Sequence, residues 1–169
     1  WPGIMRVLRS DMIATLQEDF ITTARHPIKV YLKTGVKKDG TFTARHARSI
    51  LDTGAHATHG AEVINVHGVF GLLMTYRCPN SKWEGYTVYT NNMIGGGFRG
   101  YGCPQGCFAV ESQIDEICET LGFDPVEFRL KNAAKEGTRR VDGPVYPRVG
   151  FIETLKAAQN SDHWKSKLT

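Results

Sequence analysis

The 169-residue sequence lacks the features that would place it in several broad classes. No apolar run approaches membrane-spanning length and no signal peptide is recognisable, so we expect no membrane association. The net charge of +4 comes from scattered lysines and arginines rather than a basic stripe, so nucleic acid is not an expected partner. The four cysteines are an even number, but nothing else in the sequence indicates a secreted disulfide scaffold, and we therefore expect reduced thiols and a cytoplasmic protein.

Several catalytic and metal-binding motifs are also missing. There is no Gly-Lys-Ser/Thr phosphate loop and no H-E-x-x-H zinc motif, so His56 and His59 are interpreted as polar loop residues. Cys103 and Cys107 lie four residues apart without a second pair at matching spacing, which argues against structural zinc and favours small buried thiols. The acidic residues that follow Cys107 are typical of the solvated face of an amphipathic helix: Glu111, Asp115, Glu116 and Glu119.

The residues that are present predict an α+β fold. Alternating apolar and polar residues flank Asp39–Gly40, which predicts an antiparallel hairpin over residues 28–51. A helix is expected over residues 61–74 and a strand over residues 84–91. Residues 1–25 could be helical or irregular, with weakly patterned apolar positions at Met12, Ile13, Leu16 and Phe20. The predicted helix 61–74 has one apolar face, made by Val63, Val66, Phe70 and Leu73.

Three further helices are expected in the second half of the chain. Pro104 begins the first and Gly122 ends it, with an apolar stripe of Phe108, Ile114, Ile117, Cys118 and Leu121. Asp124 caps the next helix, residues 125–132, with Glu127 placed as in a capping box. The last helix covers residues 151–159. The chain therefore divides into a β-rich part (26–91), a loop (94–103) and a helical part (104–160).

The loop itself contains the most unusual stretch, NNMIGGGFRGYGCPQG, residues 91–106. Glycine clusters commonly mark a tight reversal and nothing more. Gly95, Gly97 and Gly100 also match G-x-G-x-x-G, but the third glycine precedes the helix instead of lying in it, which argues against a dinucleotide site. A third interpretation is chemical: unshielded N–H groups near a helix start suit an anionic ligand, and Phe98 or Tyr101 could stack on a flat one.

Four sequence motifs resemble those of the molybdenum-binding subunit of the xanthine dehydrogenase and aldehyde oxidase family, and their order along the chain agrees with that family. They are GGGFRGYGCPQG (95–106), ESQIDEICETLGFDPVEFRLKN (111–132), RHPIKVYLKTGVKKDGTFTA (25–44) and LDTGAH (51–56). The resemblance extends over nearly all of residues 15–160. It implies that the chain is part of a molybdopterin-binding domain, and that residues 1–169 are an internal segment of it.

The resemblance also implies roles for individual loop residues. Cofactor binding falls to Gly97, Phe98, Arg99 and Gly100, with the backbone N–H groups of Phe98 and Arg99 facing the oxygen ligands of molybdenum. The Arg99 side chain would brace the loop. Tyr101 stands where the family usually has phenylalanine and would stack on the substrate, while His67 falls at the position of the purine-reading arginine of xanthine dehydrogenases. No catalytic residue of the family is matched in this segment, since its general-base glutamate motif is absent.

The implied function is that of a molybdenum hydroxylase, which hydroxylates an N-heteroaromatic or aldehyde carbon with oxygen derived from water. Its cofactor would be a molybdenum–pyranopterin, as molybdopterin or its dinucleotide form, with iron–sulfur clusters and FAD on other domains or subunits. The expected partners are the rest of the molybdenum subunit, those redox components, a small-molecule substrate and further copies in an oligomer. The segment alone would be inactive. The alternative is a non-catalytic α+β interaction or assembly module that retains the fold.

Overall fold

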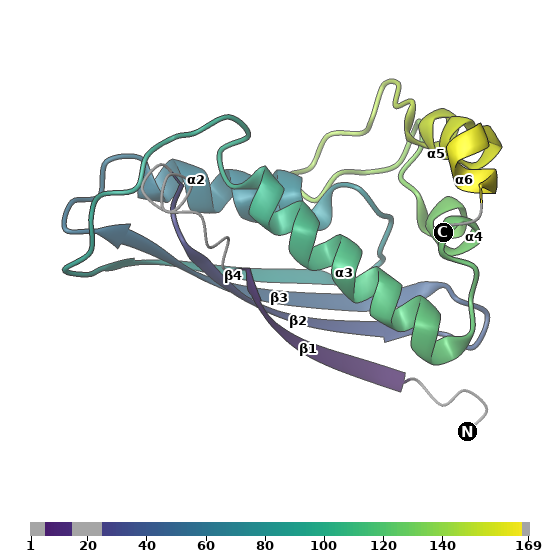
Figure 1. Ribbon diagram of the computed structural model, residues 1–169, viewed down its shortest axis with the longest axis horizontal. Coiled ribbons are helices and arrows are strands. Elements are labelled where there is room, and N and C mark those ends of the chain that lie inside the picture. Colours follow the sequence, from purple (N-terminus) through teal and green to yellow (C-terminus); the bar gives the residue numbers. More distant parts are fainter. Residues whose placement is uncertain (1–5, 15–24, 167–169) are drawn as a thin grey trace.

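The computed structural model describes the backbone of residues 6–14 and all of residues 25–166. A four-stranded sheet in the order β1-β2-β3-β4 carries helices on one of its faces (Figure 1). The β1–β2 and β2–β3 pairs are antiparallel, whereas β4 runs parallel to β3, so the sheet is mixed. The predicted α+β class is confirmed. The strands are β1 (Arg6–Ala14), β2 (Ile28–Val36), β3 (Phe42–Gly54) and β4 (Ser81–Tyr89).

The predicted hairpin is confirmed as β2 and β3. Ile28 and Leu32 are buried while the lysines between and beside them face outward, because only one face of the sheet packs against helices. The turn forms where Asp–Gly predicts it. Gly40 has a φ of 84°, and Asp39 Oδ1 accepts a hydrogen bond from the Thr41 N–H at 3.0 Å.

The helical or irregular structure expected for residues 1–25 is wrong for residues 6–14, which form β1. This strand pairs with β2 along its whole length, so the open edge of β2 supplies hydrogen-bond partners that local sequence does not reveal. Met12 and Ile13 lie in β1, whereas Leu16 and Phe20 lie outside the described residues.

The helix expected over residues 61–74 is present as two consecutive parts, α2 (Gly60–Val66) and the π-helix η1 (His67–Leu73). A π-helix bonds residue i to i+5, so its turns are wider and its faces do not continue those of an α-helix. The predicted apolar face is therefore wrong in part. Val63 and Leu73 are buried, but Phe70 is 47% exposed.

The longest helix, α3 (Cys103–Leu121), has Pro104 in its first turn, and Gly122 ends it with a φ of 71°, as predicted. Ile117 is fully buried in the core, but Phe108, assigned to the same stripe, is 54% exposed. Nine residues at about 100° each place these two side chains on opposite sides of the helix, which explains the error.

The remaining helices are α4 (Pro125–Asn132), α5 (Phe151–Asn160) and a short α6 (Asp162–Lys165). Asp124 Oδ1 caps α4, accepting from the N–H groups of Val126 at 2.9 Å and Glu127 at 2.8 Å. Arg129 on α4 binds two carboxylates of α3, Glu111 and Asp115, each at 2.8 Å. Two members of the predicted acidic face therefore join helices instead of only facing solvent.

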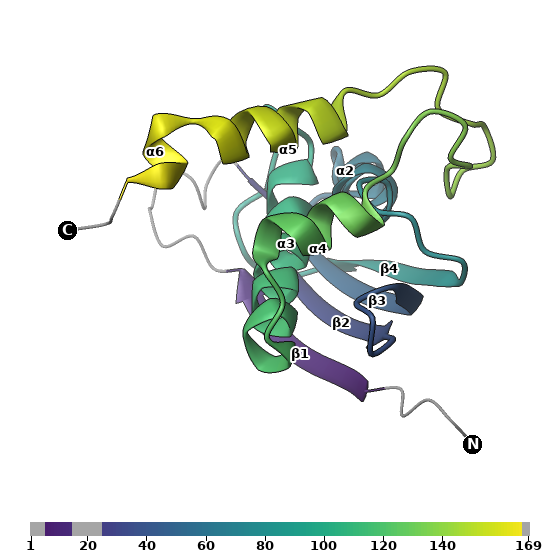
Figure 2. The same ribbon diagram turned by 90° about the vertical axis from the view of Figure 1, so that its right-hand side faces the viewer.

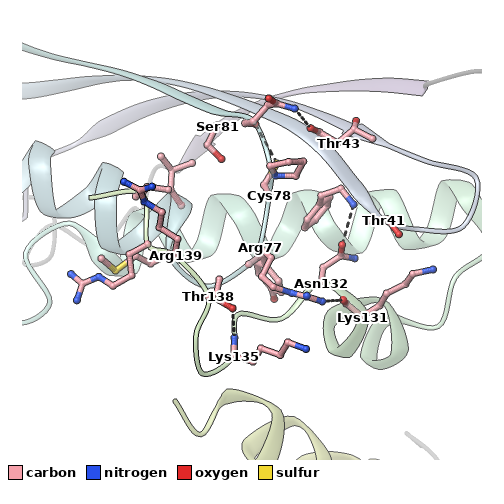
Figure 3. A pocket seen from close by; sticks show the side chains of 18 of the residues that line it. Thr41, Thr43, Arg77, Cys78, Ser81, Lys131, Asn132, Lys135, Thr138 and Arg139 are labelled. Carbon is pink, nitrogen blue, oxygen red and sulfur yellow. Dashed lines mark hydrogen bonds between the residues drawn. The ribbon is translucent and has the colours of Figure 1, made fainter. Parts of the chain in front are cut away.

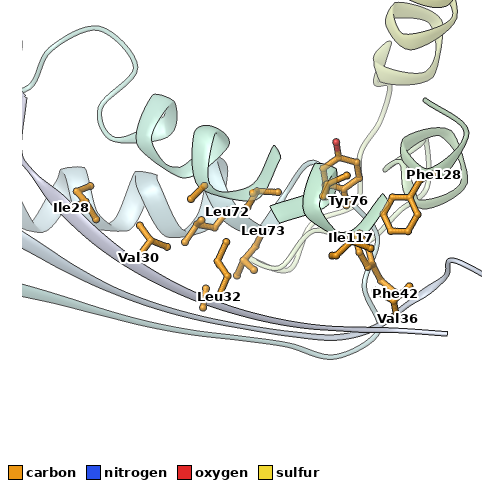
Figure 4. Packing of buried hydrophobic residues seen from close by; sticks show 14 of the residues in the cluster. Ile28, Val30, Leu32, Val36, Phe42, Leu72, Leu73, Tyr76, Ile117 and Phe128 are labelled. Carbon is orange, nitrogen blue, oxygen red and sulfur yellow. The ribbon is translucent and has the colours of Figure 1, made fainter. Parts of the chain in front are cut away.

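The hydrophobic core lies between the sheet and the helices α3 and η1 (Figure 4). Near one end of this layer, Phe42 packs edge-to-face against Tyr76 and Phe128, with ring centroids 6.0 and 5.3 Å away. Figure 2 shows α5 and α6 on the side of the helices that faces away from the sheet. The core between the sheet and the helices α3 and η1 holds α3 in place, and with it the end of the glycine loop.

Candidate functional site

The glycine loop connects the end of β4 to the start of α3 and passes beside α2 (Figure 1). Its last part is a tight turn in which the Tyr101 N–H donates to the Phe98 carbonyl at 2.9 Å. Gly100 occupies the third position of this turn with a φ of 91°, which is typical of a type II turn. The last part of the glycine loop therefore has a defined, hydrogen-bonded conformation.

Three consecutive residues of the loop have positive φ: Gly100 (91°), Tyr101 (45°) and Gly102 (93°). Among the residues that the structure describes, Tyr101 alone has a positive φ without being a glycine. This left-handed conformation costs an L residue about 1–2 kcal/mol. Contacts elsewhere must hold the tyrosine in place. The strain therefore marks the position that the sequence assigns to substrate stacking.

The two exposed aromatics of the loop lie against chain groups that orient them. The Tyr101 ring covers Gly97, where a Cβ atom would lie 2.8 Å from the ring, so glycine leaves room for it. The Arg25 guanidinium lies 4.6 Å from the centre of the Phe98 ring, within cation–π range. Both rings remain about half exposed and can still contact a ligand.

The two backbone donors expected at the metal differ in this conformation. The Phe98 N–H donates to the Gly96 carbonyl at 3.1 Å, so it is partly engaged. The Arg99 N–H has no acceptor among the residues that the structure describes. Arg99 is exposed, and its backbone is the better placed of the two to bind an anionic oxygen.

His67, the second predicted substrate residue, is fully buried. Its Nδ1 lies 3.1 Å from the Gly102 carbonyl and its Nε2 lies 3.0 Å from Ser49 Oγ, so both ring nitrogens have partners within the chain. Burial lowers the pKa of His67 to about 4, although the bond to the Gly102 carbonyl opposes this shift. A neutral, enclosed imidazole does not favour the predicted substrate contact, which stays a prediction.

A second buried histidine, His26, lies under the other end of the loop. Its Nδ1 is 3.1 Å from the Asp52 carbonyl, and its ring packs so closely on Gly95 that a Cβ there would lie 2.4 Å from Nδ1. Gln105 donates from Nε2 to the His26 carbonyl at 3.2 Å, which links this end to the first turn of α3. Two buried atoms here have no partner in the described residues, His26 Nε2 and Gln105 Oε1.

Asp52 braces the strand ends beside this histidine. Its carboxylate accepts from the Gly54 N–H at 2.8 Å, Thr90 Oγ1 at 2.6 Å and Asn92 Nδ2 at 2.6 Å. Burial opposes ionisation of Asp52, but these hydrogen bonds outweigh it and hold the pKa of the carboxyl below its usual value. The carboxylate thus ties the end of β3 to the start of the loop.

Sequence reasoning missed this support. Arg25 and His26 belong to the RHP segment that carried the resemblance, yet no role was inferred for either, nor for Asp52, Thr58 or Gln105. Thr58 Oγ1 donates to the Gly95 carbonyl at 3.2 Å. The Gln that follows Pro104 was the one available signal, because a polar residue on the buried face of a helix start needs a partner.

The four cysteines are free thiols, and burial raises the pKa of Cys103, Cys107 and Cys118. Within the described residues no three His, Cys, Asp or Glu side chains gather in a way that could hold a metal ion. His56 and His59 are exposed in the segment before α2. No helix in the described part of the chain is long and apolar enough to cross a membrane.

A cavity of about 780 Å³ lies away from the loop, between the start of β3 and the segments that follow η1 and α4 (Figure 3). Among the charged residues of its lining, cations outnumber anions: Lys37, Arg77, Lys131, Lys135, Arg139 and Arg140 against Glu136. Some are already engaged, since Lys131 pairs with Asp39 at 3.3 Å and Arg140 with Asp142. No residue of the glycine loop lines this cavity, so its size does not identify it as the cofactor site.

With this geometry established, comparison with known proteins decides the family. Residues 10–133 match the molybdopterin cofactor-binding domain. The chain belongs to the molybdopterin cofactor-binding domain family. The predicted resemblance is thereby confirmed, and with it the assignment of a molybdenum–pterin cofactor to this fold.

Related molybdopterin subunits agree with this assignment. The chain is 37% identical over 140 residues to the nicotinate dehydrogenase large molybdopterin subunit of Eubacterium barkeri, covering 82% of this chain and 33% of the relative. It is 34% identical over 153 residues to the xanthine dehydrogenase molybdenum-binding subunit of Escherichia coli O157:H7, covering 89% and 20%. The chain thus spans a third or less of the length of these relatives.

The fold also matches a solved member of the family. Aldehyde oxidoreductase from Desulfovibrio gigas superimposes with a TM-score of 0.74 at 33% identity, covering 80% of this chain and 15% of that one. The residues of the loop fit the family's cofactor in one respect that this structure reveals. Arg99 presents a backbone N–H that has no acceptor among the described residues, beside two half-exposed rings, as an anionic, flat group requires.

Proposed function

We propose that the chain is a segment of a molybdenum hydroxylase, an oxidoreductase of the xanthine dehydrogenase and aldehyde oxidoreductase type. The observation that carries the proposal is the strained loop, in which Arg99, whose N–H has no acceptor among the described residues, and Tyr101 are the second and fourth residues of one turn. A bound molybdenum–pterin group supplies a redox-active metal for the transfer of water-derived oxygen to a carbon atom. The protein residues bind and orient the reacting groups.

We assign each residue of the loop a separate role in binding the cofactor. Gly97 and Gly100 would allow the backbone to approach the cofactor, and the N–H of Arg99 would donate to an oxygen bound to the metal. Phe98 adds its N–H if its contact with the Gly96 carbonyl opens. The Arg99 side chain braces the loop. No side chain of this segment is proposed as general acid or base.

The proposed substrate is a small, flat N-heteroaromatic compound or an aldehyde. Tyr101 would stack on the substrate, and its half-exposed ring over Gly97 supports this role. His67 offers no positive charge to a purine, since its ring is buried and its pKa is lowered. A substrate that needs no cation at this position therefore fits the proposal better than xanthine does.

The proposal also covers the larger subunit, the redox partners and the location of the protein. A third or less of each relative's length is matched, which supports an internal segment of a larger molybdenum subunit that is inactive alone. Iron–sulfur clusters and FAD would lie on other domains or subunits of an oligomer. A cytoplasmic location is included because the cysteines are free thiols.

The test compares two substitutions at one residue in the full-length protein that contains this chain. Arg99 is the second residue of the type II turn, a position where proline fits, so Arg99→Pro removes the N–H while the turn is kept. Arg99→Ala removes the side chain and keeps the N–H. Molybdenum and pterin content and turnover of N-heteroaromatic compounds are then measured in both variants and the wild type.

We expect about one molybdenum per subunit in the wild type, and a loss of about a hundredfold in turnover for Arg99→Pro against a small loss for Arg99→Ala. Equal losses in the two variants would rule out the backbone donor. A well-folded wild type without molybdenum would refute the hydroxylase proposal and leave the non-catalytic assembly module as the better account.

A further inference from the structure

The chain contains a buried series of hydrogen bonds that ends at the glycine loop. Trp83 on β4 lies 3.4 Å from Ser49 Oγ on β3, Ser49 Oγ lies 3.0 Å from His67 Nε2, and His67 Nδ1 lies 3.1 Å from the Gly102 carbonyl. Ser49 and His67 are fully buried. Two strands of the sheet are thus connected through one imidazole to Gly102, the last of the three consecutive residues with positive φ.

The direction of each bond follows from its partners. A carbonyl oxygen has no hydrogen, so His67 Nδ1 must carry one and donate it to Gly102. An indole nitrogen only donates, so Ser49 Oγ accepts from Trp83 and has its own hydrogen left for His67 Nε2. Every donor meets an acceptor, and the neutral imidazole has a single allowed tautomer.

The two ends of this series are held by close packing. Trp83 lies against two glycines, Gly68 and Gly85, where added Cβ atoms would lie 2.1 and 2.4 Å from its ring. Gly102 is equally constrained, since a Cβ would lie 2.6 Å from the Val63 carbonyl oxygen and 2.9 Å from His67 Cβ. A movement of His67 would therefore reach the loop and would not be absorbed by loose packing.

We propose that His67 is a positioning residue that holds the Tyr101 turn in its left-handed conformation by donating from Nδ1 to the Gly102 carbonyl. Gly102 follows Tyr101 directly, and its carbonyl also accepts from the Gly106 N–H at 3.1 Å, in the first turn of α3. The imidazole thus fixes the plane of the peptide that joins the turn to the helix. The effect on substrate stacking rests on the proposed function, whereas the effect on the turn does not.

Three cysteines of α3 provide a readout that needs neither cofactor nor turnover. Cys103 adjoins Gly102 and is half-buried, Cys107 is exposed one turn further on, and Cys118 is buried in the core. In the full-length protein, the rate of alkylation of each thiol by iodoacetamide is measured by mass spectrometry. Cys103 reports opening of the turn, Cys107 serves as the reference, and Cys118 reports loss of the core.

Two substitutions separate the two bonds of the imidazole. His67→Asn places an amide nitrogen near the position of Nδ1 and retains the donor to Gly102, whereas His67→Gln reaches Ser49 and loses that donor. We expect His67→Gln to raise the Cys103 rate about five- to tenfold, as for the loss of one hydrogen bond, with Cys107 and Cys118 unchanged. His67→Asn should stay within about twofold of the wild type.

Three results would overturn the proposal: no change at Cys103 in His67→Gln, the same change in both variants, or Cys103 and Cys118 rising together. If the protein also turns over substrate, His67→Gln should raise KM more than it lowers kcat, because the stacking residue is displaced while the donors at residues 98–99 remain. Selective opening at Cys103 in a protein without molybdenum would uphold the positioning role and refute only the proposed function.

Discussion

The two ends of the glycine loop are held by the same kind of residue in two different ways. At the start of the loop, His26 packs under Gly95 and bonds the Asp52 carbonyl; at its end, His67 packs against Gly102 and bonds the Gly102 carbonyl. Each ring must carry its hydrogen on Nδ1, since its partner there is a carbonyl oxygen. Both imidazoles are nearly or fully buried.

The difference lies at the other nitrogen. His67 Nε2 accepts from Ser49, whereas His26 Nε2 and its neighbour Gln105 Oε1 meet no donor in the described residues. Unpaired buried acceptors destabilise the arrangement that contains them. The end next to Tyr101 is therefore the determined end, with both ring nitrogens of its histidine paired, while the end next to Gly95 is the open end, with two buried acceptors unpaired among the described residues.

The largest expected effect is on the determined end. Gly102→Ala combines a φ of 93° with a Cβ 2.6 Å from the Val63 carbonyl oxygen, so we expect a loss of about 3 kcal/mol or more in the free energy of unfolding. Urea denaturation measures it. The matched control is Gly137→Ala, where φ is 76° but nothing lies within 4 Å of the added atom, and where about 1 kcal/mol is expected. Similar losses in both variants would remove close packing from the explanation.

An intermediate effect follows from the pKa of His67. Its pKa is about 4 in the folded protein against an ordinary 6.5, so below pH 6.5 the unfolded chain binds more protons than the folded one. Stability is therefore present above about pH 6.5 and is lost as the pH falls toward 4, by at most about 3 kcal/mol. The measurement is the stability difference between wild type and His67→Asn as a function of pH, in which other titrating groups cancel. A difference independent of pH over this range would contradict the buried neutral imidazole.

The smallest effect is expected at the open end. Asp52→Asn weakens the bonds from Gly54, Thr90 and Asn92 and should cost about 1–2 kcal/mol in urea denaturation. Because the pKa of Asp52 is lowered, its contribution is present above its usual pKa and is lost at more acid pH. The control, Asp39→Asn, makes a similar change in an exposed turn and should have a smaller effect. A larger loss than that of Gly102→Ala would reverse the comparison between the two ends.

Local sequence was sufficient where one residue type enforces a conformation. Gly40 forms the hairpin turn and Gly122 ends a helix, both at positive φ, and Asp124 caps a helix, as their residue types predict. It was insufficient where a distant partner decides. β1 exists because β2 offers an open edge, and Phe70 faces outward because η1 is a π-helix.

The same division applies to the candidate site. The loop residues were identified from their own motif, but most of the side chains that support them, Arg25, His26, Asp52, Thr58 and His67, lie far away in the sequence. His67 was assigned to the substrate by its spacing from Tyr101, and spacing contains no information on burial. The network through Ser49 and Trp83 depends on strand register, Ser49 lying opposite Gly85 across β3 and β4, and a single sequence does not reveal that register.

The parallel pairing of β3 and β4 has a consequence for the time order of folding. Parallel neighbours need a long connection, here the segment that forms α2 and η1, and pairings of this kind are slow to form. Both histidines precede the loop in the chain, so during synthesis from the N-terminus each is available before residues 94–102 emerge. The turn around Tyr101 is thus expected to form late, on supports already in place, and a cofactor would meet a finished surface.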